Sequence, residues 1–230
     1  MPDIFGRALL DYQTGNYKED IVTYSTIGGR DVLPLPYLFR TYADMPGLEK
    51  KALDLCKGAI LDIGCGGGSH ALYLQERGLD VTGLDKSPGA IKTCKLRGLK
   101  KTMIGTPGAI YGTKFDTIIL LMNGIGLAET MANLSHFLFQ LKALLNPNGQ
   151  VLLDSSDIIY MYDHEEAPVQ EAYYGEASFV TEYKGIKSDP FDWLYIDFDM
   201  LRKTAEKNGW HCELVMEGEH YDYLARLTVK

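Results

Sequence analysis

The sequence predicts an α/β fold with a doubly wound, mostly parallel sheet of seven strands and an antiparallel final strand pair. Two observations support this prediction. Between residues 59 and 154, five short apolar runs alternate with segments of helical periodicity. Residues 193–230 then provide one further helix and two closing strands. We also expect an N-terminal strap and an inserted β-rich segment after the fifth strand.

A glycine-rich turn follows the first predicted strand, 59–63. Four of the five residues in 64–68 are glycine, and a helical pattern begins directly after them. Glycine is needed where φ is positive or where a ligand must approach the backbone closely. The next apolar run ends in Asp85. A glycine turn with an acid at the end of the following strand is typical of a nucleoside site, where the acid accepts the ribose hydroxyls.

The elements can be assigned in chain order from periodicity, caps and turn residues. We expect a short helix within 1–17 and an irregular strap over 18–46, where glycines and prolines prevent long elements. The next elements are a helix at 47–56, strands at 59–63, 80–85, 101–104, 115–122 and 150–154, helices at 69–77, 88–97 and 130–145, and a turn at 146–149.

The rhythm changes after the fifth strand. Residues 157–192 carry aromatic residues among alternating polar ones, which predicts one or two added strands or an antiparallel hairpin. We therefore divide the chain into a helix and strap at 1–46 and a single domain at 47–230 with an insertion at about 157–192. The strap either packs on the core or closes over a pocket as a lid.

Composition restricts the classes of partner. The formal net charge is −8 and the isoelectric point is about 5.1. Such a chain repels phosphate backbones, so we expect no nucleic-acid partner, and the lysines and arginine of 86–101 fit a solvated helix face. The four cysteines are widely spaced without a CxxC pair, which gives no support for a metal. With no signal peptide or long apolar run visible, we expect a cytoplasmic protein without a membrane partner.

Two stretches resemble the class I S-adenosylmethionine-dependent methyltransferases. The stretch 61–68, LDIGCGGG, fits the first motif of that family at every position. The stretch 81–88, VTGLDKSP, is similar to its second strand and ribose acid. The resemblance covers about 50–155 well and 193–230 moderately, but not 1–45 or 157–192. It implies S-adenosylmethionine as cofactor and methyl transfer to a small-molecule acceptor, mainly by proximity and in-line alignment.

The resemblance also implies a cofactor site. Gly64, Cys65 and Gly66 would contact the cofactor through their backbone, and Gly68 would let the helix approach the strand. Asp62 would organise the loop and accept from the methionyl ammonium, directly or through water, or merely cap the turn. The full implied set is Asp62, Gly64, Cys65, Gly66, Gly68, Asp85, Lys86, Thr106 and Asn123.

Three of these positions carry alternatives. Asp85 would bind the ribose hydroxyls or cap the helix that starts near Ser87. Thr106, or a backbone carbonyl, would meet the adenine amino group, because the acid that many family members place after the third strand is missing here. Asn123 would meet the methionyl part or the acceptor, or serve only as a turn residue before Gly124.

The acceptor side is less defined. Asp154, which ends the fifth strand, and His164, in the following loop, are candidate substrate residues, while the catalytic residue is unknown. Asn123, Asp154 and Asp157 form too thin a carboxylate cluster to favour a metal. The sequence does not determine the acceptor atom. It also leaves the oligomeric state open, with a homodimer as one possibility.

Two rival functions remain at this point. Residues 66–71 also satisfy the G-x-G-x-x-A pattern of nicotinamide-dependent oxidoreductases, with Asp85 at a suitable spacing. An acid within the motif and the antiparallel end of the sheet argue against this alternative. The other rival is a protein that binds S-adenosylmethionine without catalysis, because fold alone does not settle activity.

Overall fold

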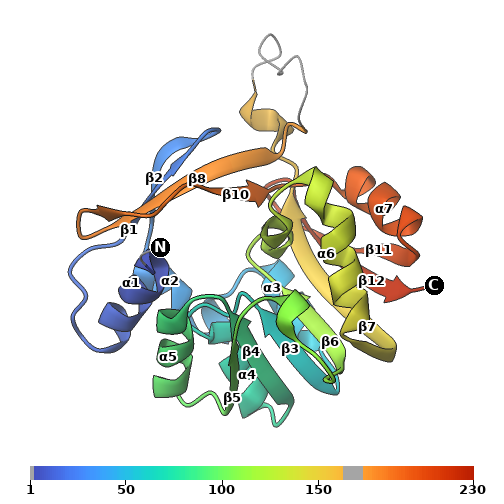
Figure 1. The fold of residues 1–230 in the computed structure, drawn as a ribbon, viewed down its shortest axis with the longest axis horizontal. Coiled ribbons are helices and arrows are strands. Elements are labelled where there is room, and N and C mark those ends of the chain that lie inside the picture. Colours follow the sequence, from blue (N-terminus) through green and yellow to red (C-terminus); the bar gives the residue numbers. More distant parts are fainter. Residues whose placement is uncertain (1–2, 163–172) are drawn as a thin grey trace.

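The computed structural model describes residues 3–162 and 173–230 (Figure 1). Its main sheet has seven strands in the order β11-β12-β7-β6-β3-β4-β5. The five strands from β7 to β5 are parallel, whereas β12 is antiparallel to both β7 and β11. The bounds are β3 Ala59–Ile63, β4 Asp80–Asp85, β5 Lys101–Ile104, β6 Phe115–Leu120, β7 Leu145–Ser156, β11 Trp210–Glu217 and β12 Asp222–Val229. The predicted fold class is confirmed.

Helices cover both faces of this sheet. Alternation along β6 shows why its apolar run is continuous: Ile118 and Leu120 pack in one core and Ile119 packs in the other. Helices α6 and α7 contribute to the first core, and α3, α4 and α5 contribute to the second. The bounds are α3 Gly47–Leu55, α4 Ser69–Glu76, α5 Pro88–Leu96, α6 Met131–Ala143 and α7 Phe198–Lys207.

A second sheet arches over the carboxyl ends of the parallel strands (Figure 1). Its antiparallel strands follow the order β10-β8-β1-β2, and β9 pairs with β8. The bounds are β1 Ile21–Ser25, β2 Gly29–Leu33, β8 Glu176–Tyr183, β9 Ile186–Lys187 and β10 Phe191–Leu194. We call this sheet the arch. It confirms the added strands predicted within 157–192.

The arch also corrects the prediction of an irregular strap over 18–46. The glycines taken as breakers form the tight turn of a hairpin, with Gly29 at φ +66°, so β1 and β2 pair directly. Strand β1 then pairs with β8, whose residues are about 160 positions away in the chain. Local composition carries no information about that partner strand.

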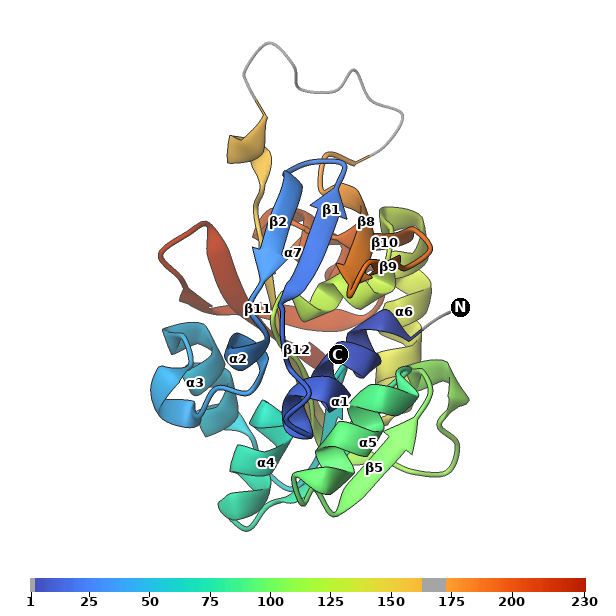
Figure 2. The same ribbon diagram turned by 90° about the vertical axis from the view of Figure 1, so that its left-hand side faces the viewer.

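The N-terminal helix α1, Ile4–Gln13, lies against α5 (Figure 2). A third core joins it to the arch and to α2, Leu35–Leu38, through residues such as Leu9, Ile21 and Tyr183. Short 3₁₀ turns lie at Tyr42–Asp44, Pro107–Ala109, Gly124–Ala128 (η3) and Ile159–Met161. In the described residues, no helix is both long and apolar enough to cross a membrane.

The boundaries of β6 and β7 differ most clearly from those predicted. Strand β6 ends at Leu120 rather than at 122, because Met122 has a φ of +68° and leaves the sheet. The predicted turn at 146–149 lies within β7, where the pairing with β6 shifts register between Phe115 and Thr117. The register shift accommodates Asn148, whose φ is +63°.

Candidate functional site

The glycine turn between β3 and α4 is held tightly against β4. The amides of Gly64 and Cys65 both donate to the carbonyl of Leu84, at 2.8 and 3.1 Å. Gly64 and Gly66 have φ values of +72° and +52°, which L-residues with a side chain rarely adopt. The turn therefore presents bare backbone at the carboxyl end of the sheet, as a close-lying ligand requires.

Asp85 lies beside this turn with its carboxylate already oriented. One oxygen accepts from the amide of Gly66 and the other from the amide of Ser87, both at 2.9 Å. Burial raises the pKa of Asp85, while these two amide hydrogen bonds oppose the rise. Each oxygen keeps a lone pair for a further donor, so the group is ready to accept two hydroxyls.

Asp62 supplies a second carboxylate from the end of β3. The residue is only 2% exposed, and its Oδ2 has no hydrogen-bond partner within the described part of the chain. Burial raises the pKa of Asp62 to about 6. A buried acceptor without a donor is rare, and ordered water or a ligand group supplies the donor in such cases. A ligand ammonium fits that description, and the aminoacyl end of S-adenosylmethionine carries one.

The other predicted cofactor residues surround this centre. Gly68, at φ +83°, has no space for a side chain, because a Cβ there would lie 3.0 Å from Sγ of Cys94 in α5. Lys86 and Thr106 are exposed at the ends of β4 and β5. Ile104 pairs with Asp85 in register and is 60% exposed, which leaves an apolar surface next to Asp85. The roles of these residues remain predictions.

Asp154 of β7 and Asn123 meet at the loop after β6. Both oxygens of the buried Asp154 accept from this loop, from the amides of Met122 and Gly124 at 3.1 Å. Asn123 has a φ of +55°, and its Oδ1 accepts from Ser156 Oγ at 2.9 Å. Asp154 thus holds the loop after β6 through two hydrogen bonds. Burial raises the pKa of Asp154 to about 6. His164 lies outside the described residues.

A buried charged cluster behind the turn was missed by the sequence reasoning. Glu49 of α3 accepts from Arg40 and contacts His70 of α4, with Arg40 Nε at 3.2 Å and His70 Nε2 at 2.8 Å. Each of the three is less than 10% exposed. Burial raises the pKa of Glu49, but the hydrogen bonds and charges of His70 and Arg40 outweigh burial and lower it below its ordinary value. Arg40 lies 9 positions before Glu49 and His70 lies 21 positions after it, so no local sequence pattern connects the three residues.

The helix predicted within 1–17 is present as α1, but the role of Asp3 at its start was missed. Asp3 caps α1 by accepting from the amide of Gly6, and its other oxygen accepts from Ser87 Oγ and the amide of Gly89. A Cβ on Gly66 would lie 3.9 Å from the ring of Phe5, so α1 reaches the glycine turn. The sequence did carry a signal for this cap, because Asp3 lies three residues before Gly6, whose amide it caps.

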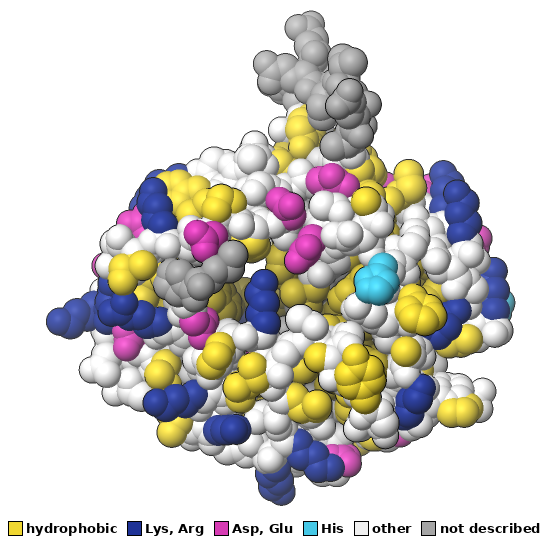
Figure 3. Space-filling model, in the orientation of Figure 1, with side chains coloured by type: hydrophobic (Ala, Val, Ile, Leu, Met, Phe, Trp, Pro, Cys, Tyr) yellow, Lys and Arg dark blue, Asp and Glu magenta, His cyan; other side chains and the backbone are white. Residues whose placement is uncertain are grey.

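Aromatic side chains line the arch above η3. Phe179 of β8 lies on the same face as the buried Thr181 and Tyr183, and its ring centroid is 6.0 Å from that of Phe191 in β10. The indole of Trp193 packs on the backbone of Gly126, where an added Cβ would lie 2.0 Å from Nε1. A hollow with apolar side chains opens below the arch (Figure 3).

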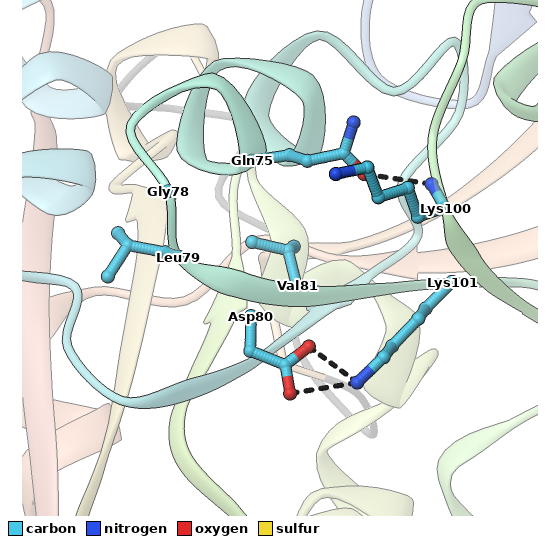
Figure 4. A pocket seen from close by; sticks show the side chains of 7 residues that line it. All are labelled: Gln75, Gly78, Leu79, Asp80, Val81, Lys100 and Lys101. Carbon is cyan, nitrogen blue, oxygen red and sulfur yellow. Dashed lines mark hydrogen bonds and ion pairs between the residues drawn. The ribbon is translucent and has the colours of Figure 1, made fainter.

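Other features do not compete with this site. A hollow of about 230 Å³ lies at the amino end of β4, where Asp80 bonds Lys101 (Figure 4). Ligands of open α/β sheets bind at the carboxyl ends instead. Within residues 3–162 and 173–230, no three His, Cys, Asp or Glu side chains are close enough to hold a metal ion.

Comparison with known proteins identifies what the chain resembles. A family model described as a methyltransferase domain matches residues 39–224. A crystal structure of an S-adenosylmethionine-dependent methyltransferase from Bacteroides fragilis, in complex with S-adenosyl-L-homocysteine, is 42% identical. The match covers all of this chain and 97% of that one, with a TM-score of 0.93.

More distant matches add less. The amino pentose methyltransferase CalS10 from Micromonospora echinaspora matches 82% of this chain and 94% of its own at 15% identity, with a TM-score of 0.59, which shows the fold alone. The mitochondrial ubiquinone biosynthesis O-methyltransferase of Schizosaccharomyces pombe is 30% identical over 101 residues, which are 42% of this chain and 37% of that protein. The matched part spans about two fifths of the length of such curated relatives.

Proposed function

The chain belongs to the S-adenosylmethionine-dependent methyltransferases, and from this premise we propose that it methylates a small molecule held between the glycine turn and the arch. The nicotinamide alternative has lost its support, because the family match covers most of the chain and the sheet ends in the pair β11–β12, in which β12 is antiparallel to both neighbours. The observation that carries the proposal is the pair of carboxylates around the turn: Asp85 is held by backbone amides, and Oδ2 of Asp62 has no hydrogen-bond partner among the described residues.

We propose specific roles for the residues around the cofactor. Asp85 accepts the ribose hydroxyls, and Asp62 accepts from the methionyl ammonium. Gly64, Cys65 and Gly66 offer their backbone, while Lys86, Thr106 and Asn123 complete the site. When bound, S-adenosylmethionine supplies a methyl group already activated by its sulfonium. The protein then has to hold the acceptor in line with that methyl group and exclude water.

The arch supports a small-molecule acceptor. Its strands come from the N-terminal strap and the insertion, and its aromatic face covers η3, where the parallel strands end. Covered apolar sites with few polar groups are typical of small-molecule binding. We therefore assign the strap within 1–46 as part of a lid over the domain at 47–230. Asp154 holds the loop after β6, which lies on the acceptor side of this proposed site. His164 stays a candidate.

Parallel calorimetric titrations test the cofactor. Purified protein is titrated with S-adenosylmethionine, S-adenosylhomocysteine and NAD. We expect micromolar binding of both sulfur nucleosides and none of NAD. Binding of NAD alone would overturn the proposal, and binding of the sulfur nucleosides without any methyl transfer would favour the non-enzymatic alternative.

Labelled methyl transfer tests the acceptor class. The protein is incubated with methyl-tritiated S-adenosylmethionine and a panel of small phenols, amines and carboxylic acids, beside bulk RNA and bulk protein. We expect label in one class of small molecule. Label confined to a macromolecule would contradict the covered-pocket assignment.

We extend the proposal to location and assembly. A reducing cytoplasm fits the four cysteines, all of which lie in the described part of the chain and carry free thiols. Cell fractionation tests this location. A homodimer is retained from the sequence reasoning, and sedimentation velocity at micromolar concentration measures it directly.

A further inference from the structure

The contact between α1 and α5 is built with unusual closeness. A Cβ on Gly89 would lie 2.5 Å from the carbonyl carbon of Gly6, so these two glycines allow the helix ends to touch. Asp3 bridges the contact: one carboxylate oxygen accepts from Gly6 at 3.0 Å, and the other from Ser87 Oγ at 2.8 Å and Gly89 at 2.9 Å. A single side chain therefore serves the first turns of two helices.

Ser87 connects this contact to the ribose acid. Its amide donates to Asp85 at 2.9 Å, while its hydroxyl donates to Asp3 and accepts from the amide of Ala90. Ser87 is 8% exposed, so water competes weakly for these bonds. Fixing the hydroxyl fixes the residue that orients one oxygen of Asp85.

From this chain of bonds we propose that Asp3 is a positioning residue for the cofactor, acting through Ser87 on the ribose-binding carboxylate of Asp85. The proposal rests on the proposed function, because it takes Asp85 to be the ribose acid. Asp3 tightens cofactor binding because it keeps the carboxylate of Asp85 in its productive orientation before the cofactor arrives. Neither stretch that resembles the family includes Asp3.

The same helix provides a matched control at its other end. Asp11 of α1 accepts from Lys184 Nζ at 2.7 Å and anchors the helix to the arch, away from α5. If α1 acted only by covering the site, Asp11→Ala would weaken cofactor binding as much as Asp3→Ala. If Asp3 acts through Ser87, only Asp3→Ala will do so.

The experiment measures the Kd of S-adenosylhomocysteine and of its 2′-deoxyribose analogue by calorimetry. We expect Asp3→Ala to weaken binding of S-adenosylhomocysteine about tenfold, a loss equal to one good positioning contact, and to weaken the deoxy analogue clearly less. Asp11→Ala should leave both Kd values within about twofold of wild type. In a protein that already carries Ser87→Ala, adding Asp3→Ala should change the Kd of S-adenosylhomocysteine only a little.

Three outcomes would overturn the inference. These are an unchanged Kd in Asp3→Ala, equal losses in Asp3→Ala and Asp11→Ala, or equal losses for the two ligands. Gly89→Ala, which displaces α1 while keeping Asp3, gives an independent route and should also weaken binding. Failure of wild type to bind S-adenosylhomocysteine would instead refute the proposed function.

Discussion

The glycine turn, which we propose as the cofactor side, and the arch, which we propose as the acceptor side, are built in opposite ways. The glycine turn, Asp62 and Asp85 lie within 24 consecutive residues, and hydrogen bonds from amides of the turn to Leu84 and Asp85 set their geometry. The arch joins residues 21–33 to residues 176–194, and its position depends on long-range packing on η3 and α1. A compact stretch of chain thus forms one half of the site, while distant segments assemble the other.

The largest expected effect is on the cofactor side. Asp85→Ala removes the carboxylate that is hydrogen-bonded to Gly66 and Ser87, so S-adenosylhomocysteine should bind at least about 100-fold more weakly. Calorimetry measures this loss. Asp80→Ala, an exposed acid at the other end of the same strand, is the control and should leave the Kd unchanged. Equal losses in both variants would contradict the assignment of Asp85.

The buried cluster of Arg40, Glu49 and His70 should be costly to break. Glu49→Gln leaves the guanidinium of Arg40 buried without its counter-charge, so the free energy of unfolding should fall by about 3 kcal/mol. Urea denaturation measures this change. Glu213→Gln breaks an exposed ion pair with Arg226 and should cost less than about 1 kcal/mol. A similar cost for both would show that the buried cluster is dispensable.

The acceptor side should respond without the cofactor side. In Gly126→Ala the added Cβ would clash with the indole of Trp193 and displace the arch. We therefore expect kcat/KM for an accepted panel compound to fall about 30-fold, while the Kd of S-adenosylhomocysteine stays constant. Gly28→Ala, in the arch but with ordinary contacts, is the control. A parallel loss of cofactor affinity would mean that the halves are not separable.

The smallest effect concerns pH. Burial holds the pKa of Asp62 near 6, whereas a ligand ammonium favours the ionised form. Affinity for S-adenosylhomocysteine should therefore fall about tenfold between pH 7 and pH 5, and Asp62→Asn should flatten the profile. In the ligand-free protein the sign reverses: the stability associated with a raised pKa is present at low pH and lost as pH rises through about 6.

Asp154 is the discriminating control for the pH profile. Its pKa is also near 6, but its oxygens face the amides of Met122 and Gly124. Asp154→Asn should therefore keep the slope of cofactor affinity. If that variant rather than Asp62→Asn removed the slope, the ammonium partner would have to be reassigned.

Sequence reasoning succeeded where the signal was local. The turn, the parallel strands, and the helix and two closing strands within 193–230 follow from periodicity and from residues that prefer special φ values. It failed where a partner was distant. The strap residues 21–33 show no sign of β8, and Arg40, Glu49 and His70 look like ordinary surface residues until folding buries them together.

The pairing of Val22 with Glu182 also has a consequence during synthesis. The N-terminal hairpin leaves the ribosome long before its partner strand exists. At roughly 5–20 residues per second, the nascent chain carries the unpaired edge of β1 for about 8–30 seconds. An open strand edge is a template for mispairing. Docking of α1 on α5 becomes available once residue 96 has emerged, and it would hold the hairpin near its destination while the rest of the chain is made.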